Sequence, residues 1–271
     1  MSVFETLRAY VGVVFQCREH LERLADSCRG IGRSLPVDLQ TLQTWLKESL
    51  RNTGLKDALL RLGVHWFDPS TFAQGGEPMS NHERGHQGRL VLYLREFKCH
   101  PHRWYEKGVE LKTATRRRWD FNAQDPQIKA SQFMNGVLAI LDTSGTKAHE
   151  LVFFGPRGNV AEGTVSNLFI FKRKRLLTPA IASGILRGVT RSVVIGLANQ
   201  RNIEVAETFL TRHEFYTAEE CFMTNTSSEV LPVAAIDGRK IARGIPGPVT
   251  RLLAKDFKQL VSSGSPLHDS H

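Results

Sequence analysis

The stretch "NVAEGTVSNLFIFKRKRLLTP", residues 159–179, decides the fold prediction, because two apolar runs in it flank the basic turn "KRKR" at residues 172–175. Branched and aromatic side chains suit a pleated, half-buried surface, so the stretch predicts strands joined by a solvated tip. Glu162 stands at the edge of the first apolar run, directly before Gly163. A buried carboxylate is costly without a partner, so the sequence also predicts a partner for Glu162.

The flanking sequence mixes strand and helix patterns without a strict strand–helix–strand repeat. The first fifteen residues predict a hairpin with its turn at Val11 and Gly12, and two amphipathic helices follow it. A further apolar helix is expected between Phe133 and Leu141. We therefore predict an α+β protein with two layers or domains, divided near residues 100–110. The Gly- and Pro-rich residues 68–88 predict either a functional lid or a mobile insertion.

The length and charge restrict the class of protein. The 271 residues allow one large domain or two of ordinary size, and 36 basic against 27 acidic side chains give a formal charge of +9. No apolar run approaches the ~20 residues that cross a membrane, and the N-terminus does not resemble a secretory signal, so we expect a cytoplasmic protein. The positive charge is spread along the chain, so we expect small anionic ligands and not nucleic acid.

The four cysteines give no sign of a metal or disulfide framework. They stand at positions 17, 28, 99 and 221, without a Cys-x-x-Cys pair. The segment "CHPH" at residues 99–102 lacks two further ligands nearby, so we predict no metal site.

Three features are suited to binding a phosphate group. "LRGVTR" puts Val189 and Thr190 at the start of a predicted helix, where free N–H groups and the helix dipole favour an anion. "MTNTSSE", residues 223–229, is a hydroxyl-rich turn after a strand, and Arg23 lies on a helix among leucines. Two of these features have a simpler interpretation. The threonine can be a helix cap, and the arginine can belong to a solvated face.

Lys129 is a candidate nucleophile. It follows a turn at Pro126 and precedes an apolar helix, so its amine can lie in partly desolvated surroundings. Such surroundings lower the pKa of an ammonium group and make lysine able to form a Schiff base. Composition alone favours a surface lysine instead.

Six motifs in order carry a family resemblance: "PQIKASQFMNGVLA", "GNVAEGTVSNLFIF", "LLTP", "GILRGVTR", "CFMTNTSSEVLPV" and "PGPVTRLL". In this order the chain resembles the class IV pyridoxal-phosphate enzymes, which include D-amino-acid and branched-chain aminotransferases and aminodeoxychorismate lyase. The resemblance implies a small N-terminal α/β domain (residues 1–106), a larger cofactor-binding α/β domain (107–262) and a disordered tail (263–271). We expect the small domain to lack the usual first hairpin of the family.

The resemblance also implies roles for individual residues. Lys129 would form the Schiff base with pyridoxal 5'-phosphate and move the substrate proton, and Glu162 would face the pyridine nitrogen. Leu186 would pack on the cofactor ring. For the substrate carboxylate we consider Arg95, in "LYLREF". Four residues would bind the cofactor phosphate: Arg23, Val189, Thr190 and Thr226.

Three functions remain open at this point. The first is an aminotransferase that moves an amino group from an amino acid, branched-chain or D-, to a 2-oxo acid. The second is aminodeoxychorismate lyase, which would release pyruvate and 4-aminobenzoate. The third is a cofactor-free, basic binding protein. The resemblance further implies a homodimer.

Overall fold

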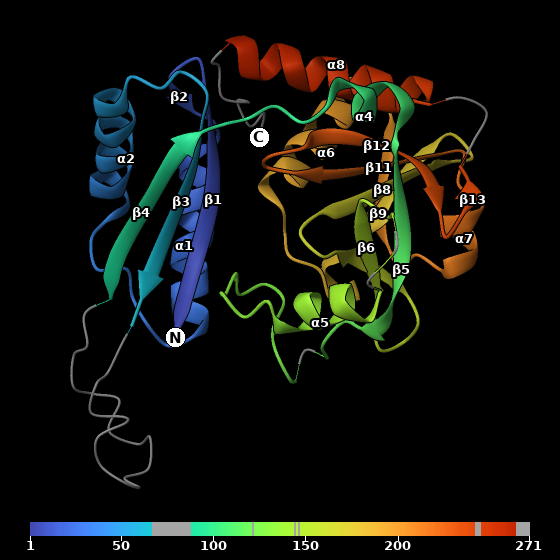
Figure 1. Cartoon of the computed structure of the whole chain (residues 1–271), viewed down its shortest axis with the longest axis horizontal. Helices are drawn as coiled ribbons and strands as arrows, with labels where there is room; N and C mark the ends of the chain where they lie inside the picture. The colour runs from blue at the N-terminus through green and yellow to red at the C-terminus, as the bar shows by residue number, and fades with distance from the viewer. Residues whose placement is uncertain (67–87, 121, 144, 146, 242–244, 264–271) are drawn as a thin grey trace, which may run out of the picture. The chain divides into compact units, whose positions relative to one another are not determined.

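The computed structural model describes residues 1–66, 88–120, 122–143, 145, 147–241 and 245–263. The chain forms two compact units, Met1–Phe97 with Ile128–Ser131, and Lys98–Gln127 with Gln132–His271 (Figure 1). The loop predicted at residues 68–88 and the predicted tail lie outside the described residues, apart from Gly88 and Ser263. Ser263 is not disordered, because it is the last residue of helix α8.

The first unit is a four-stranded antiparallel sheet in the order β2-β1-β3-β4. Its elements are β1 (Ser2–Tyr10), β2 (Val13–Val14), α1 (Cys17–Gly30), α2 (Leu39–Thr53), β3 (Ala58–His65) and β4 (Arg89–Glu96). The hairpin and both amphipathic helices that we predicted are confirmed. Alternate residues of β1 and β3, such as Val3, Leu7, Leu60 and Val64, form one core with the apolar faces of α1 and α2.

The local sequence sets the two ends of α2. The Asp38 carboxylate accepts the Thr41 N–H at 2.8 Å and so caps the first turn. Gly54 ends the helix with φ at 69°, a left-handed conformation that favours glycine.

Residues 128–131 return to the first unit and run antiparallel to the start of β1. Phe4 N–H donates to the Lys129 carbonyl at 3.0 Å, and Ser131 N–H donates to the Ser2 carbonyl at 3.1 Å. On the other side, the Ser27 hydroxyl of α1 accepts the Lys129 N–H at 3.1 Å. The backbone of Lys129 is therefore fixed between β1 and α1.

The second unit is built on a nine-stranded mixed sheet, in the order β10-β9-β8-β11-β12-β5-β6-β7, with β13 paired to β12. The strands are β5 (Val109–Arg117), β6 (Glu150–Phe154), β7 (Val160–Gly163), β8 (Asn167–Lys172), β9 (Arg175–Pro179), β10 (Glu204–Thr208), β11 (Glu220–Asn225), β12 (Glu229–Ile236) and β13 (Arg239–Lys240). The helices are α4 (His102–Lys107), α5 (Met134–Asp142), η1 (Ile181–Ser183), α6 (Val189–Gln200), α7 (Arg212–Tyr216) and α8 (Pro248–Ser263).

This division differs from the boundary that we placed between residues 106 and 107. Helix α4 packs against β12, and the Tyr105 hydroxyl donates to the Ser228 carbonyl at 3.3 Å, so residues 98–106 belong to the second unit. The α+β fold with two domains is confirmed. Among the described residues, no helix is both long and apolar enough to cross a membrane.

The stretch at residues 159–179 contains three strands. Strands β8 and β9 form the predicted hairpin, and Arg173 and Lys174 at its tip have φ of 49° and 64°, as a tight two-residue turn requires. The chain turns between Gly163 and Asn167, so β7 pairs with β6, whereas β8 pairs with β9 and β11. Glu162 therefore lies at a chain reversal.

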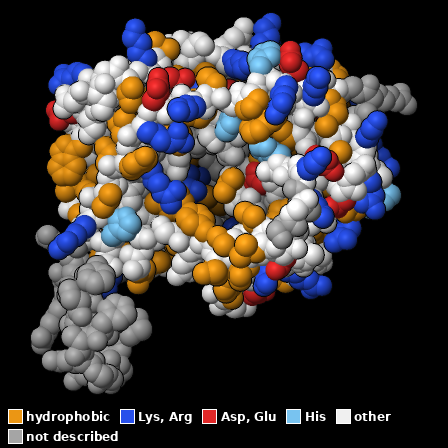
Figure 2. Space-filling view, in the orientation of Figure 1, with side chains coloured by type: hydrophobic (Ala, Val, Ile, Leu, Met, Phe, Trp, Pro, Cys, Tyr) orange, Lys and Arg blue, Asp and Glu red, His pale blue; other side chains and the backbone are white. Residues whose placement is uncertain are grey.

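Helix α5 confirms the predicted helix, and most of its apolar side chains are exposed. Ala139 is its buried residue, whereas five large apolar side chains in and before the helix are 42 to 61% exposed: Phe133, Met134, Val137, Ile140 and Leu141. Figure 2 shows hydrophobic side chains gathered over the region where α5 lies in Figure 1. We call these five side chains the α5 apolar surface.

Candidate active site

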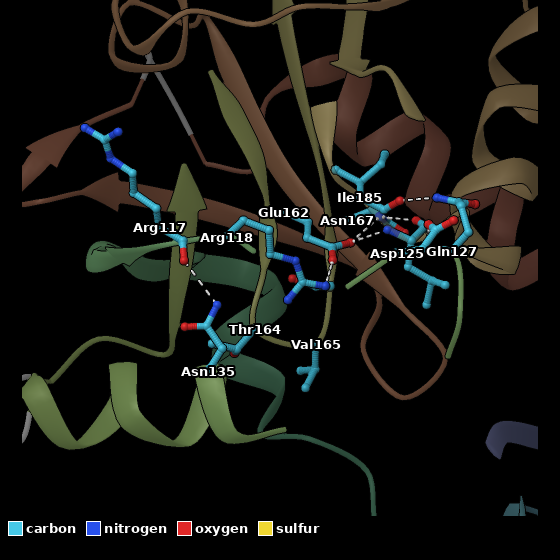
Figure 3. Close-up of polar contacts among 12 residues, drawn as sticks. Arg117, Arg118, Asp125, Gln127, Asn135, Glu162, Thr164, Val165, Asn167 and Ile185 are labelled. Atoms are coloured by element: carbon cyan, nitrogen blue, oxygen red, sulfur yellow. Dashed lines mark hydrogen bonds and ion pairs between the residues drawn. The ribbon is translucent and has the colours of Figure 1, made fainter. Parts of the chain in front are cut away.

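Glu162 lies at the end of β7 and is 5% exposed. Figure 3 shows that its carboxylate meets the Arg118 guanidinium, which ion-pairs with Oε1. Its other oxygen accepts the Leu186 N–H at 2.9 Å and the Asn167 side-chain amide at 3.3 Å. A positive charge and two further donors therefore compensate for the burial of this carboxylate.

Arg118 is a partner that the sequence did not reveal. It stands 44 positions before Glu162, in the run "RRR" at residues 116–118. The three arginines have different partners, since Arg116 pairs with Asp142 and Arg117 donates to the Pro156 carbonyl at 3.1 Å. The spacing of residues in the sequence does not indicate which of the three arginines contacts Glu162.

The segment that contains Leu186 is fixed from two sides. The Asn167 amide donates to the Leu186 carbonyl at 2.9 Å, and the Gln127 amide donates to the Ile185 carbonyl (Figure 3). Gly188 follows this segment, and Asn167 Oδ1 occupies the space that a Cβ atom at Gly188 would need. The glycine in "ILRG" therefore allows Asn167 to contact both Glu162 and Leu186.

The N-terminus of α6 presents backbone donors. Gly188 is the N-cap, without a capping side chain, and the first helical hydrogen bond runs from Ser192 N–H to the Gly188 carbonyl at 3.0 Å. The N–H groups of Val189 and Thr190 are thus outside the hydrogen bonding of the helix itself. The cap interpretation of Thr190 is wrong, because this residue lies inside the first turn.

The turn between β11 and β12 holds Thr226, which is half-buried. The Asn225 carbonyl oxygen of the side chain organises this turn by accepting the N–H groups of Ser227 and Ser228 at 3.0 and 2.7 Å. Beside it, the Thr224 hydroxyl is buried and has no hydrogen-bond partner among the described residues. A buried polar atom of this kind fits a site that takes a polar ligand.

Arg23 is held in the first unit by a buried carboxylate. Its Nε and Nη2 atoms donate to the two oxygens of Glu5 at 2.7 and 2.8 Å, and the side chain is 14% exposed. The His20 ring nitrogen Nδ1 contacts the same carboxylate at 2.8 Å. The alternative of a solvated face is therefore wrong for Arg23. Burial alone would raise the pKa of Glu5, but the Arg23 charge and the hydrogen bonds hold that pKa well below its ordinary value.

Lys129 lies in the first unit, over an aromatic ring. Its Nζ atom is 4.7 Å from the centroid of the Phe4 ring, and the side chain is half-buried. The Arg61 guanidinium carbon lies 3.9 Å from the centroid of the same ring. No sequence motif indicated Arg61, although the alternation of β3 puts it on the face opposite to the core residues Leu60 and Leu62.

Arg95 is exposed on β4 and donates to the Glu96 carbonyl at 3.3 Å. The predicted site residues are thus distributed over both units. The first unit holds Lys129, Arg23 and Arg95, and the second unit holds the others: Glu162, Leu186, Val189, Thr190 and Thr226.

In comparisons with known proteins, the chain is similar to aminotransferases in both sequence and structure. Residues 2–236 match the family model of amino-transferase class IV. The branched-chain-amino-acid aminotransferase of Pseudomonas aeruginosa is 30% identical over 274 residues, which cover 99% of this chain and 86% of that protein. The D-alanine aminotransferase of Bacillus licheniformis is 30% identical over 251 residues, or 92% and 84% of the two chains. The solved branched-chain amino acid aminotransferase of Thermobaculum terrenum, in its PLP-form, has a TM-score of 0.86 and 27% identity, over 97% and 86% of the chains.

Proposed function

Because this chain belongs to the class IV aminotransferase family, we propose that it moves an amino group between an aliphatic amino acid and a 2-oxo acid, with pyridoxal 5'-phosphate bound covalently to Lys129. The observation that carries this proposal is the environment of Glu162, a buried carboxylate held by Arg118, Asn167 and the Leu186 N–H. Such a fixed anion is the partner that a protonated pyridine nitrogen needs.

The residues of both units fit the cofactor by their chemistry. Arg23, the N–H groups of Val189 and Thr190, and the Thr226 hydroxyl would hold the phosphate, and Leu186 would pack on the ring. Glu5 supports the role of Arg23, because its two hydrogen bonds fix the orientation of the guanidinium. When bound, pyridoxal phosphate draws electrons from the bonds of the substrate Cα atom.

Lys129 is the proposed general base. Its backbone is fixed by hydrogen bonds with Phe4 and Ser27, so its amine can move only by rotation of the side-chain bonds. In its neutral form this amine can accept the Cα proton and return it.

The substrate class rests on the relatives, whose names refer to branched-chain amino acids and to D-alanine. For the substrate carboxylate we propose a guanidinium partner, either Arg95, as predicted, or Arg61, which shares the Phe4 ring with Lys129. The variants Arg95→Gln and Arg61→Gln distinguish the two candidates. Substitution of the residue that binds the carboxylate should raise KM for the amino acid about tenfold or more, and substitution of the other should leave KM near the wild-type value.

We also propose a homodimer. The α5 apolar surface supports it, because contiguous large apolar side chains are unusual on a surface that faces only water. A cytoplasmic location stays a prediction.

A turnover assay tests the proposed reaction. A branched-chain amino acid or D-alanine is supplied with a 2-oxo acid, and transfer of the amino group is followed over many turnovers. We expect steady transfer by the wild type and only background with Lys129→Ala. Release of pyruvate from aminodeoxychorismate, without an amino acceptor and without transfer activity, would support the lyase instead. No contact among the described residues favours that second function.

A further inference from the structure

The turn between β7 and β8 is built around the buried carboxyl group of Glu150, on β6. A single oxygen of Glu150, Oε1, accepts the Val165 N–H at 2.7 Å, the Ser166 hydroxyl at 2.9 Å and the Thr164 hydroxyl at 3.2 Å. Glu150 itself is 8% exposed. One buried acceptor thus fixes all three central residues of the turn.

The two residues that flank this turn belong to the candidate active site. Glu162 directly precedes Gly163, and Asn167 directly follows Ser166. Asn167 donates to Glu162 at 3.3 Å and to the Leu186 carbonyl at 2.9 Å. A displacement of the turn would therefore move Glu162 and Asn167 together.

Gly163 allows the carboxyl group of Glu150 to lie this close. A Cβ atom at Gly163 would collide with Glu150 Oε1 and with the Ser166 hydroxyl. The Gly163 N–H also donates to the Ser166 carbonyl at 2.7 Å, which closes the turn. The absence of a side chain at Gly163, directly after Glu162, thus leaves room for the Glu150 carboxyl group.

The surroundings of Glu150 shift its pKa in opposing directions. Burial raises its pKa, the three hydrogen bonds oppose that shift, and the charge of Glu162 raises the pKa further. In either protonation state this carboxyl group can accept the three hydrogen bonds through one oxygen.

We propose that Glu150 is a positioning residue for Glu162: through the turn at residues 163–166 it holds the Glu162 carboxylate where it meets the ring nitrogen of the cofactor. This inference rests on the proposed function, since it assumes that pyridoxal phosphate is the ligand. In this proposal Glu150 acts through the turn, because its hydrogen bonds go to residues 164–166.

Glu220 offers a matched control in the same unit. It is also buried, and it accepts the N–H groups of Val249 and Thr250 at 3.0 and 2.8 Å and the Thr250 hydroxyl at 2.7 Å. These contacts hold the start of α8. Substitution of Glu220 therefore removes a similar set of hydrogen bonds without touching the turn at residues 163–166.

The test compares Glu150→Gln and Glu150→Leu with Glu220→Gln and Glu220→Leu. Two quantities are measured with pyridoxal phosphate: its dissociation constant, and the pH midpoint at which the bound ring nitrogen loses its proton, followed by absorption. We expect Glu150→Leu to bind about tenfold more weakly, because three donors lose their acceptor. We expect its pH midpoint to fall by about one unit, because a displaced Glu162 stabilises the ring cation less.

Glu150→Gln keeps an acceptor oxygen, so this variant and both Glu220 variants should stay within about twofold of the wild type. If Glu150→Leu does not fold, Ser166→Ala replaces it, with one donor removed and about threefold weaker binding expected. Wild-type values in Glu150→Leu or Ser166→Ala, or an equal loss in Glu220→Leu, would overturn the inference. A wild type that binds no pyridoxal phosphate would instead overturn the proposed function, and this inference with it.

Discussion

At the scale of single residues, Arg118 is the cation that neutralises Glu162. Removing one partner of a largely buried ion pair leaves the other charge without compensation. We expect Arg118→Gln to lower the free energy of unfolding of the cofactor-free protein by about 3 kcal/mol, measured by denaturant titration. The Arg116–Asp142 pair is more exposed, at 42 and 34%, so Arg116→Gln should change that free energy by less than about 1 kcal/mol. Equal effects of the two substitutions would contradict the role of Arg118.

The Glu5 cluster predicts how stability depends on pH. The pKa of folded Glu5 lies below its ordinary value of 4.5, and burial lowers the pKa of folded His20 below 6.5. In both cases the unfolded chain takes up the proton first, so stability falls as the pH drops below about 6.5, and falls further below about 4.5.

Glu5→Gln tests this dependence. Its deficit in the free energy of unfolding should be largest near pH 7, and should shrink below about pH 4.5 as the wild-type carboxylate loses its advantage. The measurement is a series of urea titrations from pH 7 to pH 3.5. A deficit that does not change with pH would show that the Glu5 charge contributes nothing.

At the scale of elements, α5 carries the clearest prediction. Its apolar side chains follow a helical spacing that normally faces a core, but five of them are exposed in the single chain. We expect the wild type to sediment as a dimer, and Leu141→Asp to sediment as a monomer with intact circular dichroism, because a buried charge opposes association. Trp45 on α2 is 47% exposed, outside this surface, so Trp45→Asp should leave the dimer intact. Sedimentation of the wild type as a monomer would contradict the proposed homodimer.

The elements also show what periodicity can and cannot predict. The β8–β9 hairpin with its basic tip was predictable, because the tight turn and the flanking apolar runs are local. The separation of β7 from β8 was not, since pairing with β6 depends on contacts outside the stretch. The same holds for burial: the pattern of α5 predicts a helix with an apolar face, but not what covers that face.

At the scale of the whole molecule, the motifs located the candidate residues, but not their partners. The resemblance indicated Lys129 and Glu162, whereas Arg118, Glu150 and Arg61 came only from the structure. Their contacts join residues that are well separated along the chain, so local spacing gives no sign of them. The position of residues 128–131 in the first unit could not be predicted for the same reason. It depends on backbone hydrogen bonds to Ser2 and Phe4, which are far away in the sequence.

The central claim is that Lys129 binds pyridoxal phosphate covalently, and the visible absorption spectrum of the purified protein after incubation with this cofactor tests it most directly. We expect an absorption band in the wild type and in Lys112→Ala, and no such band in Lys129→Ala. Lys112 is a half-buried lysine on β5 and serves as the control. A wild type that stays colourless, or an unchanged band in Lys129→Ala, would contradict the claim.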